Sequence, residues 1–152
     1  MITIQLAGIP ITIDNHFDFI ADQCRDYYSR SSGLVHIQAS LEEIQAEQAG
    51  ESFDLGYCES ICVYRKIALA LIEYDVFLFH GAALKYHDQV LLFTGVSGSG
   101  KSTHIRLWQE LFPHEVTIIN GDKPLIKKVL HFWHSDPPGT AKKAGGLMRL
   151  VR

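Results

Sequence analysis

The sequence predicts an α/β fold, with a core built on a mixed sheet and a smaller α+β portion preceding it. Two observations predict it: a period-two alternation of apolar residues opens the chain, and an apolar strand, a glycine-rich loop and a helical pattern follow one another in its second half. The length of 152 residues fits one domain with a small appended part. With 47% apolar and 20% charged residues, the composition is typical of a folded chain.

Composition and charge exclude several classes of protein. The 14 basic and 17 acidic residues give a net charge of −3, which argues against a general nucleic-acid binder because such proteins need a cationic face. No apolar run reaches the roughly 18 residues that span a bilayer, and no signal-peptide pattern opens the sequence. We therefore expect a cytoplasmic protein with neither membrane nor nucleic-acid partners. Cys24, Cys58 and Cys62 fit buried free thiols better than a zinc site, since no second Cys/His pair stands at the usual spacing.

Residues 1–75 are expected to form the small α+β portion. Alternation before and after residues 8–10 predicts a β-hairpin with its turn at these residues. Asp14 or Asn15 is expected to cap a helix that ends near residue 28.

The rest of this portion is predicted to hold one more strand and two helices. A short strand is expected at residues 34–39. Ser40 and Glu43 match the capping box at the start of a helix. Residues 59–74 carry apolar side chains at intervals of three and four, which predicts an amphipathic helix.

Residues 76–130 are expected to form the core, and residues 131–152 an atypical tail. The hydrophobic pattern predicts, in chain order, one buried strand at 77–84, a turn at 86–89, a return strand at 90–94, a loop at 95–100, a helix at 101–111 and a strand at 116–120.

Residues 95–102 are the most specific motif, because they match G-x-x-x-x-G-K-[ST] at every fixed position. The glycines let backbone amides point onto phosphate oxygens, and the following helix adds the positive end of its dipole. Lys101 would contact the β- and γ-phosphates, and the Ser102 hydroxyl would ligate Mg²⁺. An ordinary glycine-rich turn is the alternative. The candidate nucleotide-binding residues are Gly95, Ser97, Gly98, Ser99, Gly100, Lys101, Ser102 and Thr103.

Asp122 is a second candidate metal ligand. It follows the strand at 116–120, where a carboxylate could hold Mg²⁺ directly or through water. The alternative is a turn aspartate, because residues 120–124 are rich in turn formers. Lys123 fits a surface lysine as well as it fits a phosphate contact.

His80 is the one histidine of eight that we place near chemistry. It closes the apolar run at 77–79, and Gly81 beside it allows a close approach of backbone. A lone histidine in an apolar strand is more often a hydrogen-bonded core residue, and its position alone favours that interpretation.

Taken together, these residues resemble the catalytic domain of HPr kinase/phosphorylase over roughly residues 77–126. The resemblance depends on the stretch 80–84, on the phosphate loop after a short hairpin and on residues 120–122. Residues 64–67, 79–84 and 122–124 are similar to small HPr-kinase-like bacterial proteins, some of which accompany peptide-modification clusters whose members phosphorylate a peptide serine. The wider group includes ATP-dependent phosphoenolpyruvate (PEP) carboxykinase, so the resemblance implies an HPr kinase/PEP carboxykinase-like P-loop core.

The resemblance implies a role for each matching residue. Lys101 and Ser102 become the phosphate and metal residues, and Asp122 becomes the second aspartate of the family's pair, the one nearer the metal. His80 matches the active-site histidine. The first aspartate of the pair, the usual candidate for the general base, is Gly121 here. The chain therefore takes its base from elsewhere or does not deprotonate a serine in that way, and we do not expect the phosphorylase half of the parent reaction.

These observations predict an ATP- and Mg²⁺-binding kinase that phosphorylates a hydroxyl group on a peptide or protein acceptor. The catalytic candidates are His80, Lys101 and Asp122, and the metal candidates are Ser102 and Asp122. Self-association is expected because the parent family forms oligomers. Two alternatives stay open: a nucleotide sensor or scaffold with impaired catalysis, and a small-molecule kinase or carboxykinase-like enzyme.

The tail from residue 131 shows no sustained period. Where the resembled proteins have a loop of the form Gly-[Ser/Thr]-Pro-Trp-x-Gly-Lys-Glu-Gly, this chain holds residues 133–145. The codons allowed here, read two bases later, permit Gly-Ser-Pro-Trp-Asn-Gly-Lys-Glu-Gly. We hypothesise a frameshift near residues 130–133, with a genuine divergent tail as the alternative. A frameshifted tail should pack poorly from about residue 134 and leave turnover weak or absent.

Overall fold

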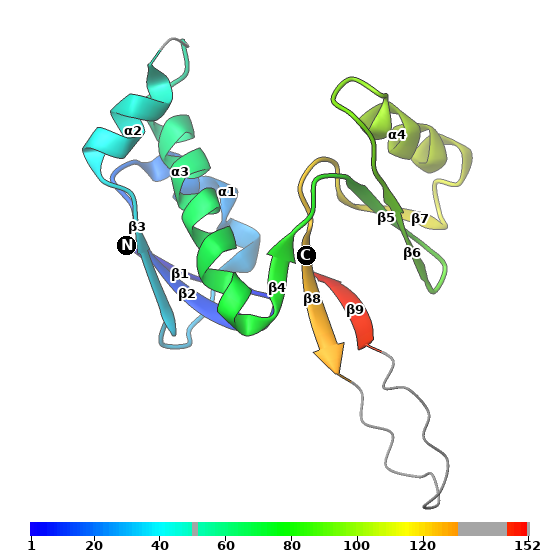
Figure 1. Ribbon diagram of the computed structural model, residues 1–152, viewed down its shortest axis with the longest axis horizontal. Helices are drawn as coiled ribbons and strands as arrows, with labels where there is room; N and C mark the ends of the chain where they lie inside the picture. The colour runs from blue at the N-terminus through cyan, green and yellow to red at the C-terminus, as the bar shows by residue number, and fades with distance from the viewer. Residues whose placement is uncertain (50–51, 131–145, 152) are drawn as a thin grey trace, which may run out of the picture. The chain divides into compact units, whose positions relative to one another are not determined.

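A computed structural model describes residues 1–49, 52–130 and 146–151 of the protein. The chain divides into two units, Met1–Tyr74 and Asp75–Arg152. In the described residues, the first unit combines several helices with one three-stranded sheet, and the second combines one helix with two such sheets, so the fold is mixed α/β (Figure 1).

The first unit is a three-stranded sheet covered by helices. Its sheet has the order β1-β2-β3, with β1 antiparallel and β3 parallel to β2. Every second side chain of these strands is buried, as Ile4, Ile11 and Ile37 illustrate, because one face lies against the helices. The elements in chain order are β1 (Ile2–Leu6), β2 (Ile9–Asp14), α1 (Asp18–Gln23), the 3-10 turn η1 (Arg25–Tyr27), β3 (Val35–Gln38), α2 (Leu41–Gln48), α3 (Leu55–Ala70) and the 3-10 turn η2 (Leu71–Tyr74).

The predicted hairpin is present, but its turn is not at residues 8–10. Ala7 and Gly8 form the turn, with φ angles of 55° and 80°, and Ile9 and Pro10 already belong to β2. Consecutive left-handed residues match the right-handed twist of the two strands, which is why a two-residue turn suffices here.

The cap predicted for the first helix is wrong. Phe17, rather than Asp14 or Asn15, stands at the N-cap of α1, and it makes no side-chain cap bond. The fully buried carboxylate of Glu59 in α3 instead accepts hydrogen bonds from the backbone amides of His16 (2.6 Å) and Phe17 (3.0 Å). A residue more than 40 positions away therefore supplies the acceptor that sequence reasoning sought locally.

The capping box of α2 is confirmed. The Glu43 amide donates to Ser40 Oγ at 3.2 Å, and the Ser40 amide donates to Glu43 Oε2 at 2.7 Å. The following helix, α3, begins at Leu55 rather than at residue 59, because Asp54 accepts a hydrogen bond from the Gly56 amide at 2.8 Å and caps it.

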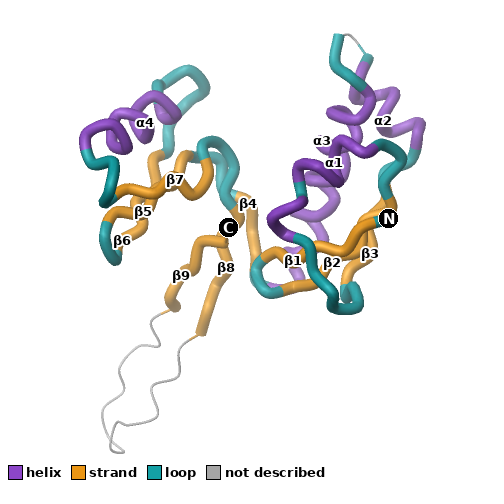
Figure 2. The backbone as a smooth tube through the Cα atoms, turned by 180° about the vertical axis from the view of Figure 1, so that it is seen from behind, coloured by secondary structure: helices purple, strands orange, loops and turns teal. Residues whose placement is uncertain are grey.

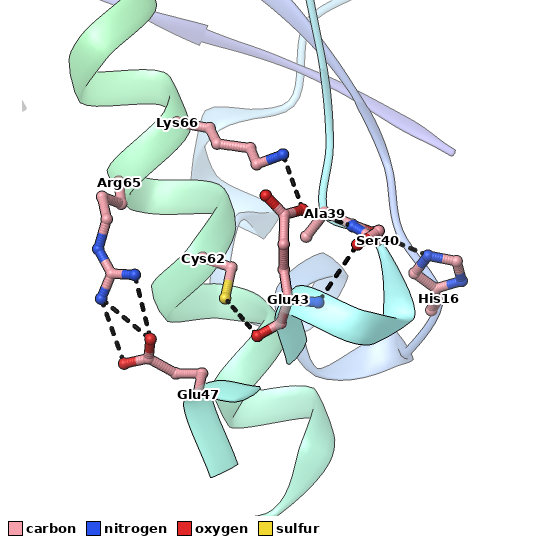
Figure 3. A network of polar contacts seen from close by, with 8 residues as sticks. All are labelled: His16, Ala39, Ser40, Glu43, Glu47, Cys62, Arg65 and Lys66. Atoms are coloured by element: carbon pink, nitrogen blue, oxygen red, sulfur yellow. Dashed lines mark hydrogen bonds and ion pairs between the residues drawn. The ribbon is translucent and has the colours of Figure 1, made fainter. Parts of the chain in front are cut away.

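Ion pairs join α2 to α3 (Figure 3). Arg65 donates from both terminal nitrogens to the Glu47 carboxylate at 3.0–3.2 Å, and Lys66 Nζ lies 2.8 Å from Glu43 Oε2. The buried Cys62 thiol donates to the Glu43 carbonyl at 3.7 Å. Residues that carried part of the family resemblance, Arg65 and Lys66, thus hold two helices together in this unit.

The described residues of the second unit form two three-stranded sheets, β6-β5-β7 and β4-β8-β9, in which every paired neighbour is antiparallel. The mixed sheet predicted for the core is therefore found in the first unit instead, where β3 is parallel and β1 antiparallel to β2. The strand predicted at 116–120 and the helix predicted at 101–111 are confirmed to the residue. The elements in chain order are β4 (Val76–Leu78), β5 (Ala82–Tyr86), β6 (Gln89–Phe93), α4 (Lys101–Leu111), β7 (Val116–Asn120), β8 (Leu125–Leu130) and β9 (Gly146–Val151).

The single strand predicted over residues 77–84 is wrong, because the chain leaves one sheet and enters the other between β4 and β5. The amides of Phe79 and Gly81 donate to the carbonyls of Pro124 (2.9 Å) and Asp122 (2.8 Å). A Cβ on Gly81 would lie 2.7 Å from the Phe93 carbonyl oxygen, so only glycine fits between these two backbone segments.

The order β6-β5-β7 positions the candidate site. Both outer strands run antiparallel to β5, so β6 and β7 run parallel to each other and end at the same edge of the sheet. Helix α4 connects them and packs on the sheet (Figure 2), where Ile105 is buried with Ala82, Leu84 and Val116. Phe93 and Trp108 extend this core.

The tail lies only partly within the described residues. Residues 131–145 fall outside them, and residues 146–151 form β9, which pairs with β8. The frameshift hypothesis stays a prediction. In the described part of the chain, no helix combines the length and apolar character needed to cross a bilayer.

Candidate functional site

The glycine-rich loop joins the end of β6 to the start of α4, and residues 95–100 are exposed. Gly98 and Gly100 have φ angles of 78° and 84°, in the left-handed region that other residues adopt at a cost. A Cβ at either position would meet no atom within 4 Å. The backbone conformation, rather than crowding, therefore requires glycine at these two positions, and it turns the chain into α4 at its N-cap, Gly100.

Lys101 folds back over this loop. Its Nζ donates to the carbonyl oxygens of Gly95 (2.9 Å) and Val96 (3.1 Å). The ammonium group is thus held at the loop that the motif assigns to phosphates, by neutral acceptors that a phosphate oxygen would outcompete for a cation.

Ser102 links the loop to the next strand. Its hydroxyl lies in the first turn of α4 and donates to the carbonyl oxygen of Gly121 at 3.1 Å. Because the proton points to Gly121, the lone pairs of Ser102 Oγ face away from this bond, as a metal ligand requires.

Asp122 lies in a turn directly after β7. Asn120 Oδ1 accepts hydrogen bonds from the amides of Asp122 (2.9 Å) and Lys123 (2.8 Å), which is the local turn favoured after asparagine. The Asp122 carboxylate is 66% exposed and lies 3.6 Å from His80 Nε2 and 3.6 Å from Lys123 Nζ. Asp122 is therefore both a turn residue and an accessible carboxylate, so the two interpretations of the sequence do not exclude each other.

His80 is not the core histidine of an apolar strand. It lies in the connection between β4 and β5, and its side chain is 55% exposed. The structure thus brings together three of the predicted residues at one sheet edge, Ser102 through Gly121 and His80 through Asp122. The other predicted residues occupy the loop and the first turn of α4, where Ser97 and Thr103 are exposed and the Ser99 amide donates to the Val96 carbonyl at 3.2 Å.

Sequence reasoning missed two residues that shape this edge. Asn120 counts as a turn former and as part of the resemblance at 120–122, and neither assigns a role to its side chain. An asparagine followed by Gly-Asp after a strand favours a side-chain-capped turn and could have indicated that role. The role of the Gly121 carbonyl had no signal, because its contact with Ser102 depends on how α4 packs on the sheet.

The residues present fit a Mg²⁺-bound nucleotide. Ser102 Oγ and the Asp122 carboxylate are hard oxygen donors, and Mg²⁺ bound with phosphates commonly takes only one or two protein ligands. Within the described ranges no cluster of three or more His, Cys, Asp and Glu side chains could hold a metal by itself. The three cysteines are free thiols, as the sequence predicts, but only Cys58 and Cys62 are buried, while Cys24 is partly exposed. Burial raises the pKa of Cys58 and Cys62.

Comparison with models of known protein families, with curated proteins and with solved structures found no match to this chain. The functional conclusion therefore depends on the chemistry of the site itself.

Proposed function

We propose that this chain binds a nucleoside triphosphate with Mg²⁺ and transfers a phosphoryl group to a hydroxyl of a peptide or protein. Three assignments belong to this proposal: a P-loop core, ATP and Mg²⁺ as cofactors, and a peptide or protein as the acceptor. The observation that carries it is the hydrogen bond from Ser102 Oγ to the Gly121 carbonyl, which joins the glycine-rich loop to the turn that holds Asp122.

Each residue of this edge would have a separate role in phosphoryl transfer. Lys101 would exchange its bonds to the loop carbonyls for bonds to the β- and γ-phosphates, which are stronger because both partners are charged. Ser102 and Asp122 would hold Mg²⁺, which neutralises phosphate charge when bound. Such catalysis requires mainly positioning and electrostatic stabilisation.

We assign to His80 the role of receiving the acceptor's proton. Position 121, where the resembled family has the aspartate considered as general base, holds glycine. His80 is exposed, and its Nε2 lies 3.6 Å from Asp122 Oδ1. An imidazole nitrogen is the group that most often takes a proton in general acid–base catalysis.

A nucleotide sensor without turnover is the second candidate. The observation that favours it is Gly121: the edge keeps the glycine-rich loop, Lys101 and Ser102 but lacks a carboxylate at position 121, which transfer would use as a base.

Calorimetric titration with ATP and Mg²⁺ tests the binding step. We expect Lys101→Ala to weaken nucleotide affinity by about 100-fold or more, because charge-assisted hydrogen bonds to the phosphates are lost. Lys85→Ala, an exposed lysine on β5, is the matched control and should bind as the wild type does. Wild-type affinity in the Lys101→Ala variant would sink the proposal.

Labelled ATP separates the two candidates. Incubation with Mg²⁺ and serine-containing peptides should transfer label from the γ-position to peptide if the chain is a kinase. Binding without transfer to any acceptor supports the sensor.

A further inference from the structure

We propose that Asn120 is the positioning residue that holds both Mg²⁺ ligands of this edge in place. This inference rests on the proposed function and extends it to a residue that contacts neither phosphate nor metal. It is carried by the backbone of β7 and by two side-chain hydrogen bonds.

A β-bulge sets the direction of Asn120. Ala83 of β5 pairs with Asn120, and the next residue, Leu84, pairs with Ile118, so Ile119 is an extra residue in β7. A bulge of this kind bends the strand and redirects the side chains that follow it, and bulges concentrate next to functional sites. Here it comes immediately before the turn that carries Asp122.

The Asn120 side chain then fixes the turn. Its Oδ1 accepts from two consecutive amides, those of Asp122 at 2.9 Å and Lys123 at 2.8 Å. These bonds close the backbone around Gly121, whose carbonyl receives the Ser102 hydroxyl at 3.1 Å. The side-chain oxygen of Asn120 therefore determines the direction of the Gly121 carbonyl and the position of the Asp122 backbone, from which the carboxylate extends.

Two backbone hydrogen bonds hold the other side of the turn independently of Asn120. The Asp122 carbonyl accepts from the Gly81 amide at 2.8 Å, and the Pro124 carbonyl accepts from the Phe79 amide at 2.9 Å. Losing Asn120 would thus free the segment between β7 and Asp122 without detaching the turn from the connection between β4 and β5. We expect a local loss of order at the metal ligands and a preserved fold.

The test measures nucleotide affinity with and without Mg²⁺ by calorimetry, together with the melting temperature. For the wild type, Mg²⁺ should tighten ATP binding. For Asn120→Ala, we expect Mg²⁺-free affinity within about twofold of the wild type and at least a tenfold loss of the Mg²⁺-dependent gain, because the phosphate loop is intact while the metal ligands are not held.

Two variants control for an indirect effect. Asn120→Asp keeps an acceptor oxygen at the same distance from the backbone and should restore the Mg²⁺-dependent gain to at least the wild-type level. Thr117→Ala alters an exposed residue of the same strand and should change neither affinity.

The outcomes are distinguishable. Equal Mg²⁺ dependence in Asn120→Ala and the wild type would overturn the positioning role, and so would a uniform loss of affinity with and without Mg²⁺, since that is what a merely structural residue gives. A wild-type protein whose ATP binding ignores Mg²⁺ would overturn the proposed function, and this inference with it.

Discussion

At the scale of single residues, Glu59 shows how much one buried carboxylate can stabilise. Its two oxygens accept the amides of His16 and Phe17 at the start of α1. Glu59→Ala should lower the free energy of unfolding by about 2 to 3 kcal/mol, because both amides lose a charged partner in a buried setting. Urea unfolding measures this loss. Glu73→Ala, which removes an exposed carboxylate in η2, is the control and should cost about 0.5 kcal/mol or less. An equal effect of both variants would contradict the capping role.

Under the proposed function, Gly121 is the residue at which a substitution should increase the rate of phosphoryl transfer. A Cβ there would meet only Ile105 Cδ1, at 3.9 Å, which is an ordinary contact, so a side chain is tolerated. Under the proposed function, Gly121→Asp should raise the rate of transfer to a peptide by about tenfold or more, because a positioned general base typically contributes at least that factor. Rates of label transfer, with Gly121→Asn as the uncharged control, check this. Nucleotide binding at wild-type strength with an unchanged rate in Gly121→Asp would count against the kinase.

At the scale of elements, the charge network between α2 and α3 makes stability depend on pH. The hydrogen bond from Lys66, followed by that from the Ser40 amide, lowers the pKa of Glu43. Glu43 therefore stays ionised to lower pH in the folded chain than in the unfolded one, in which a glutamate has a pKa of about 4.3. Its stabilising contribution is present above that pH and is lost as the pH falls through the lowered folded-state pKa.

Glu43→Gln should reduce this dependence on pH. We expect the wild-type melting temperature to fall more steeply than that of the variant between about pH 5 and pH 3, because only the wild type gains a proton at this position on unfolding. Glu42→Gln in the same helical turn is exposed and serves as the control. Parallel melting curves for Glu43→Gln and the wild type over this range would show that the network does not titrate as described.

The same scale shows what the sequence could predict. Helix α4, strand β7 and the capping box of α2 follow from local signals, namely a helical pattern after the glycine-rich loop, an apolar run and the Ser40–Glu43 pair, and the structure confirms them. The break at residues 79–81 could not be predicted, because its cause is the fit of Gly81 against the Phe93 carbonyl from a later strand. An apolar run indicates burial but not which of two sheets each half enters.

The candidate site, like the fold, could be predicted from the sequence only in part. The motif at 95–102 identified the phosphate-loop candidates because each fixed position has a local physical reason. The Gly121 carbonyl, which accepts the hydrogen bond from Ser102, acts across the end of a sheet, so its role emerges only with the strand order.

At the scale of the whole molecule, all candidate site residues belong to the unit Asp75–Arg152. They come from three segments, at 80–81, 95–103 and 120–123, and the first unit contributes none of them. Under the proposed function these three segments bind the nucleotide and Mg²⁺ and receive the acceptor's proton, and none of them is assigned to recognition of the acceptor.

The position of β5 between β6 and β7 has a consequence for how this unit folds. The β5–β6 hairpin closes through the short turn at His87 and Asp88, and such hairpins form within about 1–10 μs. Strand β7 can pair with β5 only after a loop of some 30 residues has closed, which is a slower and entropically costlier step. Early in folding, the glycine-rich loop is therefore attached to a formed hairpin but does not yet lie beside β7. It comes to lie beside the end of β7 only when β7 pairs with β5, so under the proposed function a chain in which this pairing is missing would bind a nucleotide weakly.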